Sequence, residues 1–483
     1  MRVNAELTTE VGRWLGPLLF VVLYLMPTGD LEGSAKAVAG AALWMAVWWV
    51  TEAAPLAATS LLPMVLFPLL GVRPIRLVTV NYANHMVFLF LGGFALALAV
   101  ERSGLHRRVA LAVLDKVGAS PRRLVWGFLL VTAGLSMWLS NTATTLMLLP
   151  IAAGVAVRME NDLADTRLFL AVAYGASVGG MATLVGTPPN LVLAGMAPEL
   201  VPDLPALTFG GWMLFGLPLV MILIPLIGLR LGRGLVGGGG RCDSLGDERR
   251  KLGSVGPRER RAALLFSLTA LAWITRPGFD FGIFRVPGWG DFLTDPKMVS
   301  DAVPAIAAAI LATLLPAGDG KGARLLTWDD LHHGIPWGIL LLFGGGFALA
   351  DSVHASGLSA WLAQQLGGLA GLPLPLIILT LCLFATFATE LTSNTATATL
   401  LLPVMAALSG ILEVPPYLLM VAVTVSCSCA FMLPVATPPN AIVIGSGCVT
   451  TKEMFREGLW LNLMVAGVVT FFVLVWGPLV LPS

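Results

Sequence analysis

The sequence predicts an all-α polytopic membrane protein. Of its 483 residues, 57% are hydrophobic and 12% are charged, which is about half the charged share of an ordinary soluble domain. The mean hydropathy is +0.85, and apolar stretches of roughly 17 to 25 residues, long enough to cross a bilayer, recur along the chain. The net charge of +1 does not indicate nucleic acid as a partner, because the charged residues are concentrated in loops. The partner that this composition predicts is the lipid bilayer.

The N-terminal segment, residues 1–33, is expected to contain the first span. An apolar stretch at 14–26 follows a mixed polar start. The residues after it, "LMPTGDLEG", are a poor match to the cleavage site of a signal peptide. We therefore expect this stretch to be a transmembrane helix.

The rest of the chain is an internal duplication. "FLGGFALALAVERSGL" at 90–105 resembles "LFGGGFALADSVHASGL" at 342–358, and "LSNTATTLMLLP" at 139–150 resembles "TSNTATATLLLP" at 392–403, with aligned residues 253 positions apart. "VGTPPN" at 185–190 and "VATPPN" at 435–440 follow at an offset of 250. One register across several landmarks identifies two related halves. We assign repeat 1 to 34–232, a cytoplasmic linker to 233–260 and repeat 2 to 261–483.

Basic loops predict the orientation of the halves. Residues 101–123 and 230–261 are rich in Arg and Lys, so the positive-inside rule places both in the cytoplasm. The loops "AGMAPELVPDLP" and "HASGLSAWLAQQLGGLAGLPLP" contain neither residue and are expected outside. The two "GGF" segments are thus followed by loops on opposite sides, which predicts inverted-topology repeats with the N-terminus cytoplasmic and the C-terminus external. Arg73 and Arg76, external in this scheme, count against it.

Each Ser-Asn-Thr triplet lies in an apolar segment whose two ends are expected on one side of the membrane. These segments, about 123–158 and about 372–413, are predicted to be re-entrant hairpins with the triplet at the tip. Irregular backbone at membrane depth is tolerated where it is buried in protein or lines a watery cavity. Inverted repeats with broken helices are typical of secondary transporters.

The triplets are suited to binding small ions. Ser, Asn and Thr are favoured N-caps, and an apolar helix is predicted to begin just after each triplet. A helix N-terminus presents free N–H groups and a positive dipole end, which favours a carboxylate or another oxyanion. Hydroxyl, amide and carbonyl oxygens can instead coordinate a small hard cation. One triplet can therefore serve an anion on one side and Na⁺ on the other.

The two "TPPN" stretches are predicted to interrupt membrane helices at about 167–200 and about 416–447. Proline favours the first position of a helix and disfavours helical geometry in the residue before it. Four helix breaks, two in each repeat, could converge on one site.

Charged residues are nearly absent from both hairpins, since Glu390 is the only acid or base between Arg123 and Arg158 and between Leu372 and Glu413. An anionic substrate would then depend on helix ends and a co-bound cation, which favours Na⁺ coupling, and two related tips favour a substrate with two anionic ends. Glu390 itself is either a proton carrier or a residue in an aqueous vestibule near the tip. Glu52, in "WWVTEAAP", is expected to be structural or interfacial.

Catalytic and redox motifs are not found. The five cysteines form no CxxC pair, and the five histidines form no HExxH. No Ser-His-Asp set stands at a useful spacing. We therefore expect no enzyme activity and no organic cofactor, and a channel lined by the hairpins is the alternative outside the transporters.

These motifs carry a family resemblance. "SMWLSNTATTLMLLP", "TLVGTPPN", "TELTSNTATATLLLP", "PVATPPN" and "TEAAPLAATSLLPMVLFPLLG" resemble the divalent anion:sodium symporters, the INDY-type dicarboxylate and citrate transporters. The resemblance implies about eleven transmembrane helices, two re-entrant hairpins and a homodimer. It also implies a scaffold domain and a transport domain that moves like an elevator.

The resemblance also implies which residues bind the ligands. Substrate carboxylates would contact Ser140, Asn141, Thr142, Thr187, Ser393, Asn394, Thr395 and Thr437. A first Na⁺ site would use Ser136, Ser140, Asn141 and Gly186. A second would use Thr389, Thr392, Asn394 and Ala436, several of these through backbone carbonyls.

The function that we expect is sodium-coupled secondary active symport of C4-dicarboxylates such as succinate, malate and fumarate. A Na⁺-independent dicarboxylate exchanger, or a sulfate or tricarboxylate transporter of the same fold, is the alternative. The short termini and the lack of a recognised targeting segment favour a multi-pass protein of a cell membrane, such as a bacterial inner membrane.

Overall fold

The computed structural model describes residues 2–27, 31, 33–118, 120–156, 162–235, 243–280, 285–318, 322–366, 368 and 371–482. Most of them are helical, and two short strands are the only ones that the described residues form, which confirms the predicted helical fold class. Parts of two predicted segments, 157–161 at the end of the first hairpin and 236–242 in the linker, lie outside the described residues. The rest of the linker contains a helix, α13 (Asp243–Lys251), and the next helix begins at Pro257.

Half of the helices form a set that we call the frame. Its members in the first half of the chain are α1 (Arg2–Leu25), α2 (Gly33–Thr51), α3 (Leu56–Thr59), α4 (Leu62–Leu69), α5 (Ile75–Tyr82), α6 (His85–Ser103) and α7 (Leu105–Val117). Its members in the second half are α14 (Pro257–Thr275), α15 (Ala302–Leu314), α16 (Trp328–Gly334), α17 (Trp337–Ala355) and α18 (Leu358–Leu366). Between α14 and α15 lie the short antiparallel strands β1 (Phe279–Asp280) and β2 (Arg285–Val286) and the 3₁₀ turns η2 (Trp289–Phe292) and η3 (Pro296–Met298).

The remaining helices, apart from α13 of the linker, form a second set, which we call the hairpin group. In the first half these are α8 (Pro121–Ser136), α9 (Asn141–Ala156), α10 (Asp162–Gly179), the 3₁₀ turn η1 (Gly180–Ala182), α11 (Pro188–Leu200) and α12 (Phe209–Leu231). In the second half these are α19 (Leu374–Thr389), α20 (Asn394–Leu412), α21 (Pro416–Cys427), α22 (Pro438–Gly445) and α23 (Thr451–Val480). A four-residue tip joins α8 to α9, and another joins α19 to α20. The helix α19 begins and ends 253 positions after α8, and α20 begins 253 positions after α9.

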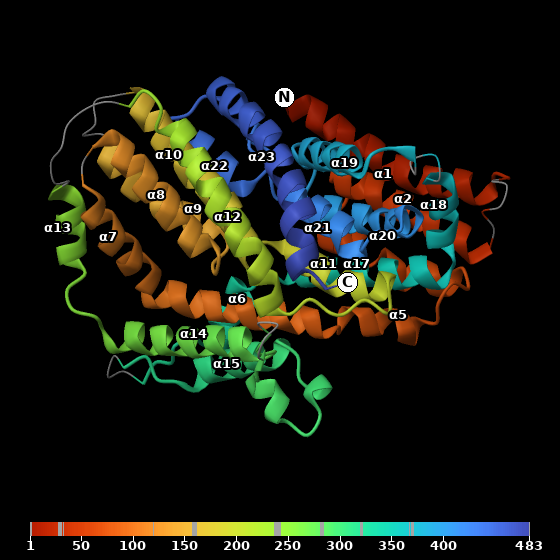
Figure 1. Ribbon diagram of the computed structural model, residues 1–483, viewed down its shortest axis with the longest axis horizontal. Helices are drawn as coiled ribbons and strands as arrows, with labels where there is room; N and C mark the ends of the chain where they lie inside the picture. Colours follow the sequence, from red (N-terminus) through yellow and green to blue (C-terminus); the bar gives the residue numbers. More distant parts are fainter. Residues whose placement is uncertain are drawn as a thin grey trace.

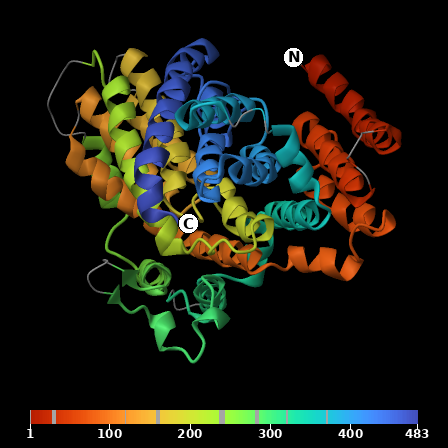
Figure 2. The ribbon, with the colours of Figure 1, turned by 45° about the vertical axis from the view of Figure 1, so that its right-hand side comes forward.

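The two sets are arranged around the middle of the molecule. In Figure 1 and Figure 2, α1 and α2 lie at the side opposite α7 and α8, while α14 and α15 lie beneath α6. Within the hairpin group, α10 packs against α8 and α9, and α21 packs against α19 and α20. The two halves are also joined crosswise, because α11 packs against α20 and α22 packs against α9. These contacts between the halves bring both hairpin tips to the same region.

Several helices are long and apolar enough to cross a bilayer. Among the described residues these are Ile75–Ser103 (α5 with α6), Phe209–Leu231, Trp337–Ala355, Asn394–Leu412 and Thr451–Val480. Shorter apolar helices, including α9, α15, α19 and the half-helix α21, lie beside them. The structure is therefore that of a multi-pass membrane protein, and the expected total of eleven spans stays a prediction.

The "GGF" segments explain how the frame contacts both its own helices and the hairpin group. A Cβ on Gly92 would lie 2.3 Å from the backbone carbon of Ala305 in α15, and one on Gly345 would lie 2.3 Å from the backbone oxygen of Ser60. Only glycine permits such close helix crossings. The following glycine, Gly93, instead faces Val185 of the hairpin group.

Candidate functional site

The first hairpin tip is a compact turn that is held by its own polar side chains. Ser140 precedes α9, and its Oγ accepts a hydrogen bond of 3.1 Å from the Ala143 N–H, which caps the helix. The hydroxyl of Ser136, at the end of α8, donates to Oδ1 of Asn141 at 2.6 Å. This bond joins the two arms of the hairpin and leaves the Asn141 amide N–H₂ without a partner among the described residues.

The second tip repeats this geometry. Thr389 Oγ1 lies 2.6 Å from Asn394 Oδ1 and 2.9 Å from the backbone oxygen of Cys427 in α21. Ser393 is the N-cap of α20, but its side chain makes no capping hydrogen bond. Thr392 Oγ1 contacts the Ala388 carbonyl at 3.0 Å, inside the hairpin. Oxygen atoms therefore crowd together behind each tip, and the Ser393 hydroxyl is left for a ligand.

The two helix breaks are held open by asparagines of the "TPPN" stretches. Asn190, fully buried, donates its side-chain N–H₂ to the carbonyls of Gly180, Met181 and Thr183, at 3.3, 3.3 and 2.8 Å. Asn440 does the same for Ala430 and Leu433, at 3.1 and 3.0 Å. Carbonyls that the interruption of a helix would leave unpaired are satisfied in this way.

Glu390 fixes the second break. Its carboxylate accepts hydrogen bonds from the backbone N–H groups of Phe431, Met432 and Leu433, at 2.7, 2.9 and 2.9 Å. It also accepts one from the side-chain amide of Asn462 in α23, at 2.8 Å. With 2% of its surface exposed, Glu390 does not lie in an aqueous vestibule, so that expectation is wrong. All four bonds are donated to the carboxylate, which makes it a structural anchor for the break rather than an exposed proton carrier.

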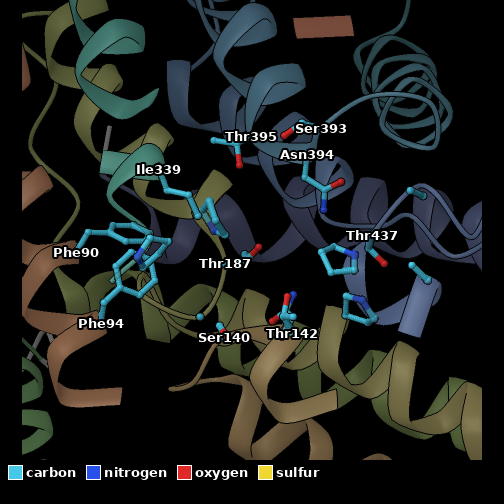
Figure 3. Close-up of a pocket in the computed structure, with 18 of the residues that line it drawn as sticks. Phe90, Phe94, Ser140, Thr142, Thr187, Ile339, Ser393, Asn394, Thr395 and Thr437 are labelled. Atoms are coloured by element: carbon cyan, nitrogen blue, oxygen red, sulfur yellow. The ribbon is translucent and has the colours of Figure 1, made fainter. Parts of the chain in front are cut away.

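Four helices begin at the edge of a single cavity. They are α9, α11, α20 and α22, and the cavity has a volume of about 740 Å³. Figure 3 shows Ser140 and Thr142 on one side of it, Ser393, Asn394 and Thr395 on the other, and Thr187 and Thr437 between them. The Thr187 side chain makes no capping hydrogen bond although Thr187 is the N-cap of α11. The cavity therefore collects four positive helix ends and several unpaired hydroxyl and amide groups.

The frame supplies the rest of the wall. Its contributors are mostly apolar and come from the end of α2 and the residue after it, from α6, and from the junction of α16 with α17: Trp49, Val50, Glu52, Phe90, Phe94, Ala97, Leu98, Glu101, Gly334, Pro336 and Ile339. Among the described lining residues, no Lys, Arg or His occurs, and the charged side chains are Glu52 and Glu101. Any anion in this cavity would be held by helix ends and neutral donors.

The structure brings the residues predicted from the sequence together. All eight predicted substrate contacts line the cavity: Ser140, Asn141, Thr142, Thr187, Ser393, Asn394, Thr395 and Thr437. Of the predicted Na⁺ ligands, Gly186, Thr392 and Ala436 also line it, whereas Ser136 and Thr389 are fully buried just behind the tips. These positions fit the expected roles, and the roles themselves stay predictions.

Some lining residues were missed from the sequence. The sequence does not single out Phe90, Phe94 and Trp49, because an apolar residue on an apolar helix does not reveal which face it occupies. Glu52, expected to be structural or interfacial, lines the cavity and has a left-handed backbone, φ 50°. The asparagine of each "TPPN" was a visible signal that was not used, since a buried amide needs partners.

Spanning helices around a cavity with four helix N-termini define a membrane transport protein for a small anionic ligand. The comparisons with known proteins agree. The family described as "Sodium:sulfate symporter transmembrane region" matches residues 10–482. The chain belongs to this family, the divalent anion:sodium symporters, and is a transporter rather than an enzyme.

Curated relatives of the chain are similar over nearly their whole length. The sodium-dependent dicarboxylate transporter SdcS of Staphylococcus saprophyticus is 39% identical over 96% of this chain and 90% of its own. The SdcS protein of Staphylococcus aureus strain NCTC 8325 is also 39% identical, over 98% of this chain and 92% of its own.

Solved structures share the fold at low sequence identity. The MtrF protein of Neisseria gonorrhoeae, described as one of a class of antimetabolite efflux pumps, has a TM-score of 0.60 at 13% identity and covers 95% of this chain and 96% of its own. The YdaH transporter of Alcanivorax borkumensis has a TM-score of 0.55 at 16% identity, covering 83% and 87%. These two similarities concern the fold alone.

Proposed function

We propose that this protein is a sodium-coupled symporter of C4-dicarboxylates, with succinate, malate and fumarate as its substrates. The observation that carries the proposal is the meeting of four helix N-termini at one cavity whose described lining contains no cationic side chain. Each N-terminus acts as roughly half a positive charge, so four of them supply about two, which matches a dianion. The 39% identical relatives named as sodium-dependent dicarboxylate transporters support the same choice.

The dianion would bridge the two tips. One carboxylate would accept hydrogen bonds from the side chains of Asn141, Thr142 and Ser140, and the other from those of Asn394, Thr395 and Ser393. Thr187 and Thr437, which lie between the tips in Figure 3, would supply further hydroxyl groups. The amide N–H₂ groups of both asparagines suit this role because only their oxygens are engaged in the hairpins.

Na⁺ would occupy the crowded oxygen sites behind the tips. At the second tip, the Thr389 hydroxyl has one proton but two acceptor oxygens within 2.9 Å, on Asn394 and Cys427. Converging oxygens with too few protons are the ligands that a small hard cation needs. Thr392 and Ala436 would complete this site, and Ser136, Ser140, Asn141 and Gly186 would form the site at the first tip. The Cys427 carbonyl is a further ligand that the sequence did not suggest.

Coupling would follow from charge compensation. The cavity has helix dipoles but no mobile positive charge, and moving an unbalanced dianion through the membrane is expensive. Bound Na⁺ would both order the tips for the substrate and neutralise part of its charge. Protein with only Na⁺ or only the dianion bound would then rarely carry it across the membrane.

The movement that we propose is an elevator motion. The hairpin group carries both tips and both breaks, while the frame supplies the opposite, mostly apolar wall of the cavity. The hairpin group would act as the transport domain and the frame as the scaffold of a homodimer. The two inverted repeats, 34–232 and 261–483, would give the inward and outward states their related geometry, in a cell membrane with the N-terminus in the cytoplasm.

Uptake of radiolabelled succinate into proteoliposomes tests the proposal. An inward Na⁺ gradient should drive uptake without internal substrate, whereas an equal K⁺ gradient should not. Uptake that ignores Na⁺ and requires internal dicarboxylate would identify an exchanger instead. A protein that takes up sulfate or citrate but no succinate would refute the assignment of substrate.

A further inference from the structure

The frame helix α6 presents one face to the cavity. Its lining residues are Phe90, Phe94, Ala97, Leu98 and Glu101, which recur at the three- and four-residue spacing of one helical face. Four of the five are apolar. Glu101 is the one charged group on this face, and it lies about 10 Å further along the helix than Phe94, at about 1.5 Å per residue.

The carboxylate of Glu101 is not neutralised by a partner. In the described part of the chain, no hydrogen bond or ion pair to it is found. The neighbouring Arg102, which does not line the cavity, forms its ion pair with Asp330 of α16, at 3.1 Å, and acts on Glu101 through its charge without bonding to it. Glu101 is partly buried, so water screens its charge less than that of an exposed side chain. The hydrogen bonds and ion pairs of the frame therefore give this carboxylate no structural role.

Size alone does not limit the substrates of the cavity. About 740 Å³ lies within the range of pockets that hold drug-sized ligands, roughly 300–1,000 Å³, and a C4-dicarboxylate is much smaller. A tricarboxylate would also fit. Discrimination between two and three carboxylates must then come from charge, and the wall opposite the tips offers two acidic groups, Glu101 on α6 and Glu52 after α2, and no basic one among its described residues.

We propose that Glu101 is a specificity-determining residue, which excludes tricarboxylates by repelling a third carboxylate that projects from the tips toward α6. This inference rests on the proposed dicarboxylate function and adds the residue that sets the charge of the accepted substrate. A dianion held by both tips directs its remaining surface, which is apolar, at Phe90, Phe94 and Leu98. A trianion directs a charge at the same wall, where it meets the unpaired carboxylate in a partly desolvated space.

The test compares two inhibitors of succinate uptake that have nearly the same shape. Tricarballylate is succinate with a carboxymethyl arm, and 2-isobutylsuccinate carries an uncharged arm of the same size. Inhibition constants are measured in proteoliposomes at one Na⁺ concentration, at a pH where all carboxylates are ionised. The variants are Glu101→Gln, Glu101→Asp and, as a control outside the cavity, Glu413→Gln, which removes an exposed carboxylate.

The wild type should be inhibited far more strongly by 2-isobutylsuccinate than by tricarballylate. Glu101→Gln should reduce this preference about tenfold, which corresponds to about 1.4 kcal/mol of lost repulsion. Glu101→Asp should keep most of it, and Glu413→Gln should keep all of it. An unchanged preference in Glu101→Gln overturns the inference while leaving the proposed function intact.

Two other outcomes are also decisive. If Glu101→Gln no longer transports, the same preference is measured as thermal stabilisation of the purified protein by each inhibitor, because a ligand that binds the folded state raises its stability. A wild-type preference in that assay overturns the inference. If the wild type takes up no succinate, the proposed function fails. If the wild type then binds tricarballylate and 2-isobutylsuccinate equally strongly, Glu101 does not select by charge.

Discussion

Replacing Glu390 by Gln should loosen the second helix break. In the wild type, Oε1 accepts hydrogen bonds from Phe431, Met432 and Asn462, and Oε2 accepts one from the Leu433 N–H. A glutamine oxygen can replace Oε1, but its N–H₂ group then faces the Leu433 N–H, and two donors cannot bond. One buried N–H loses its partner, and three charge-assisted bonds become neutral ones.

The size of the effect follows from these bonds. The change from charge-assisted to neutral acceptors costs about 1 kcal/mol per bond, and the orphaned N–H costs about 1–3 kcal/mol more. Glutamine is neutral and so lacks the desolvation cost of the buried Glu390 charge, which offsets part of this sum. We expect a net loss of about 2–4 kcal/mol, concentrated in residues 428–437, the break between α21 and α22. Asn462→Ala, which removes one donor, should cost less.

The consequence for function is a weaker response to Na⁺. The break contains Ala436 and directly follows Cys427, whose carbonyl and Ala436 both belong to the proposed second Na⁺ site. If about 2 kcal/mol of the loss falls on the Na⁺-competent geometry, the Na⁺ concentration for half-maximal uptake should rise roughly 30-fold.

Two measurements together decide the matter. Thermal unfolding of the detergent-purified protein reports stability, and succinate uptake at graded Na⁺ concentrations reports the half-saturating value. Glu453→Gln is the matched control, because Glu453 accepts hydrogen bonds from Thr450 at the start of α23, away from the break, and glutamine preserves such a cap. A Glu390→Gln protein with wild-type stability and wild-type Na⁺ dependence would refute the reasoning.

Three further predictions concern single sites. Asn141→Ala and Asn394→Ala should each abolish uptake while leaving the folded protein extractable, because each removes an amide from a tip; wild-type uptake in either variant contradicts the assigned site. Gly186→Ala should also abolish uptake, since its Cβ would lie 2.4 Å from the Gly180 carbonyl oxygen, whereas Gly467→Ala, with no atom within 4 Å of the added Cβ, should transport normally. Asp330→Asn should destabilise the protein by about 0.5 kcal/mol at neutral pH, because asparagine keeps the capping acceptor but loses the partly exposed ion pair with Arg102. Burial raises the pKa of Asp330, but hydrogen bonds from Thr327 and the charge of Arg102 outweigh this, and the net pKa is below its ordinary value. The difference in melting temperature between Asp330→Asn and the wild type should therefore shrink as the pH falls below about 4, where the wild-type carboxyl takes up its proton; a constant difference would count against this role.

The sequence predicted the local parts of the site well. The helical membrane fold and the symporter family are both confirmed, and the duplicated motifs gave the residues that meet at the cavity. This succeeded because N-caps and Pro-Pro breaks are determined by neighbouring residues. The division into repeats and the membrane topology stay predictions.

Contacts between distant segments could not be predicted in the same way. Glu390 bonds to residues 41 to 72 positions away, and nothing in its own neighbourhood indicates those partners. Apart from Glu101, the residues of α6 that line the cavity are as apolar as the rest of the helix, so only the packed structure distinguishes Phe94 from an outward-facing phenylalanine.

The anchoring carboxylate also breaks the equivalence of the two halves. At an offset of 253 from Glu390 stands Met137, whose backbone oxygen accepts a hydrogen bond from Thr183. The first tip is thus held by neutral groups, and the second by a fixed negative charge. Two Na⁺ ions bound behind these tips would experience different electrostatic potentials, so the second site should fill at the lower Na⁺ concentration. The two proposed ion sites would then be unequal although the motifs that form them are duplicated, and this inequality would impose an order of binding on the pair.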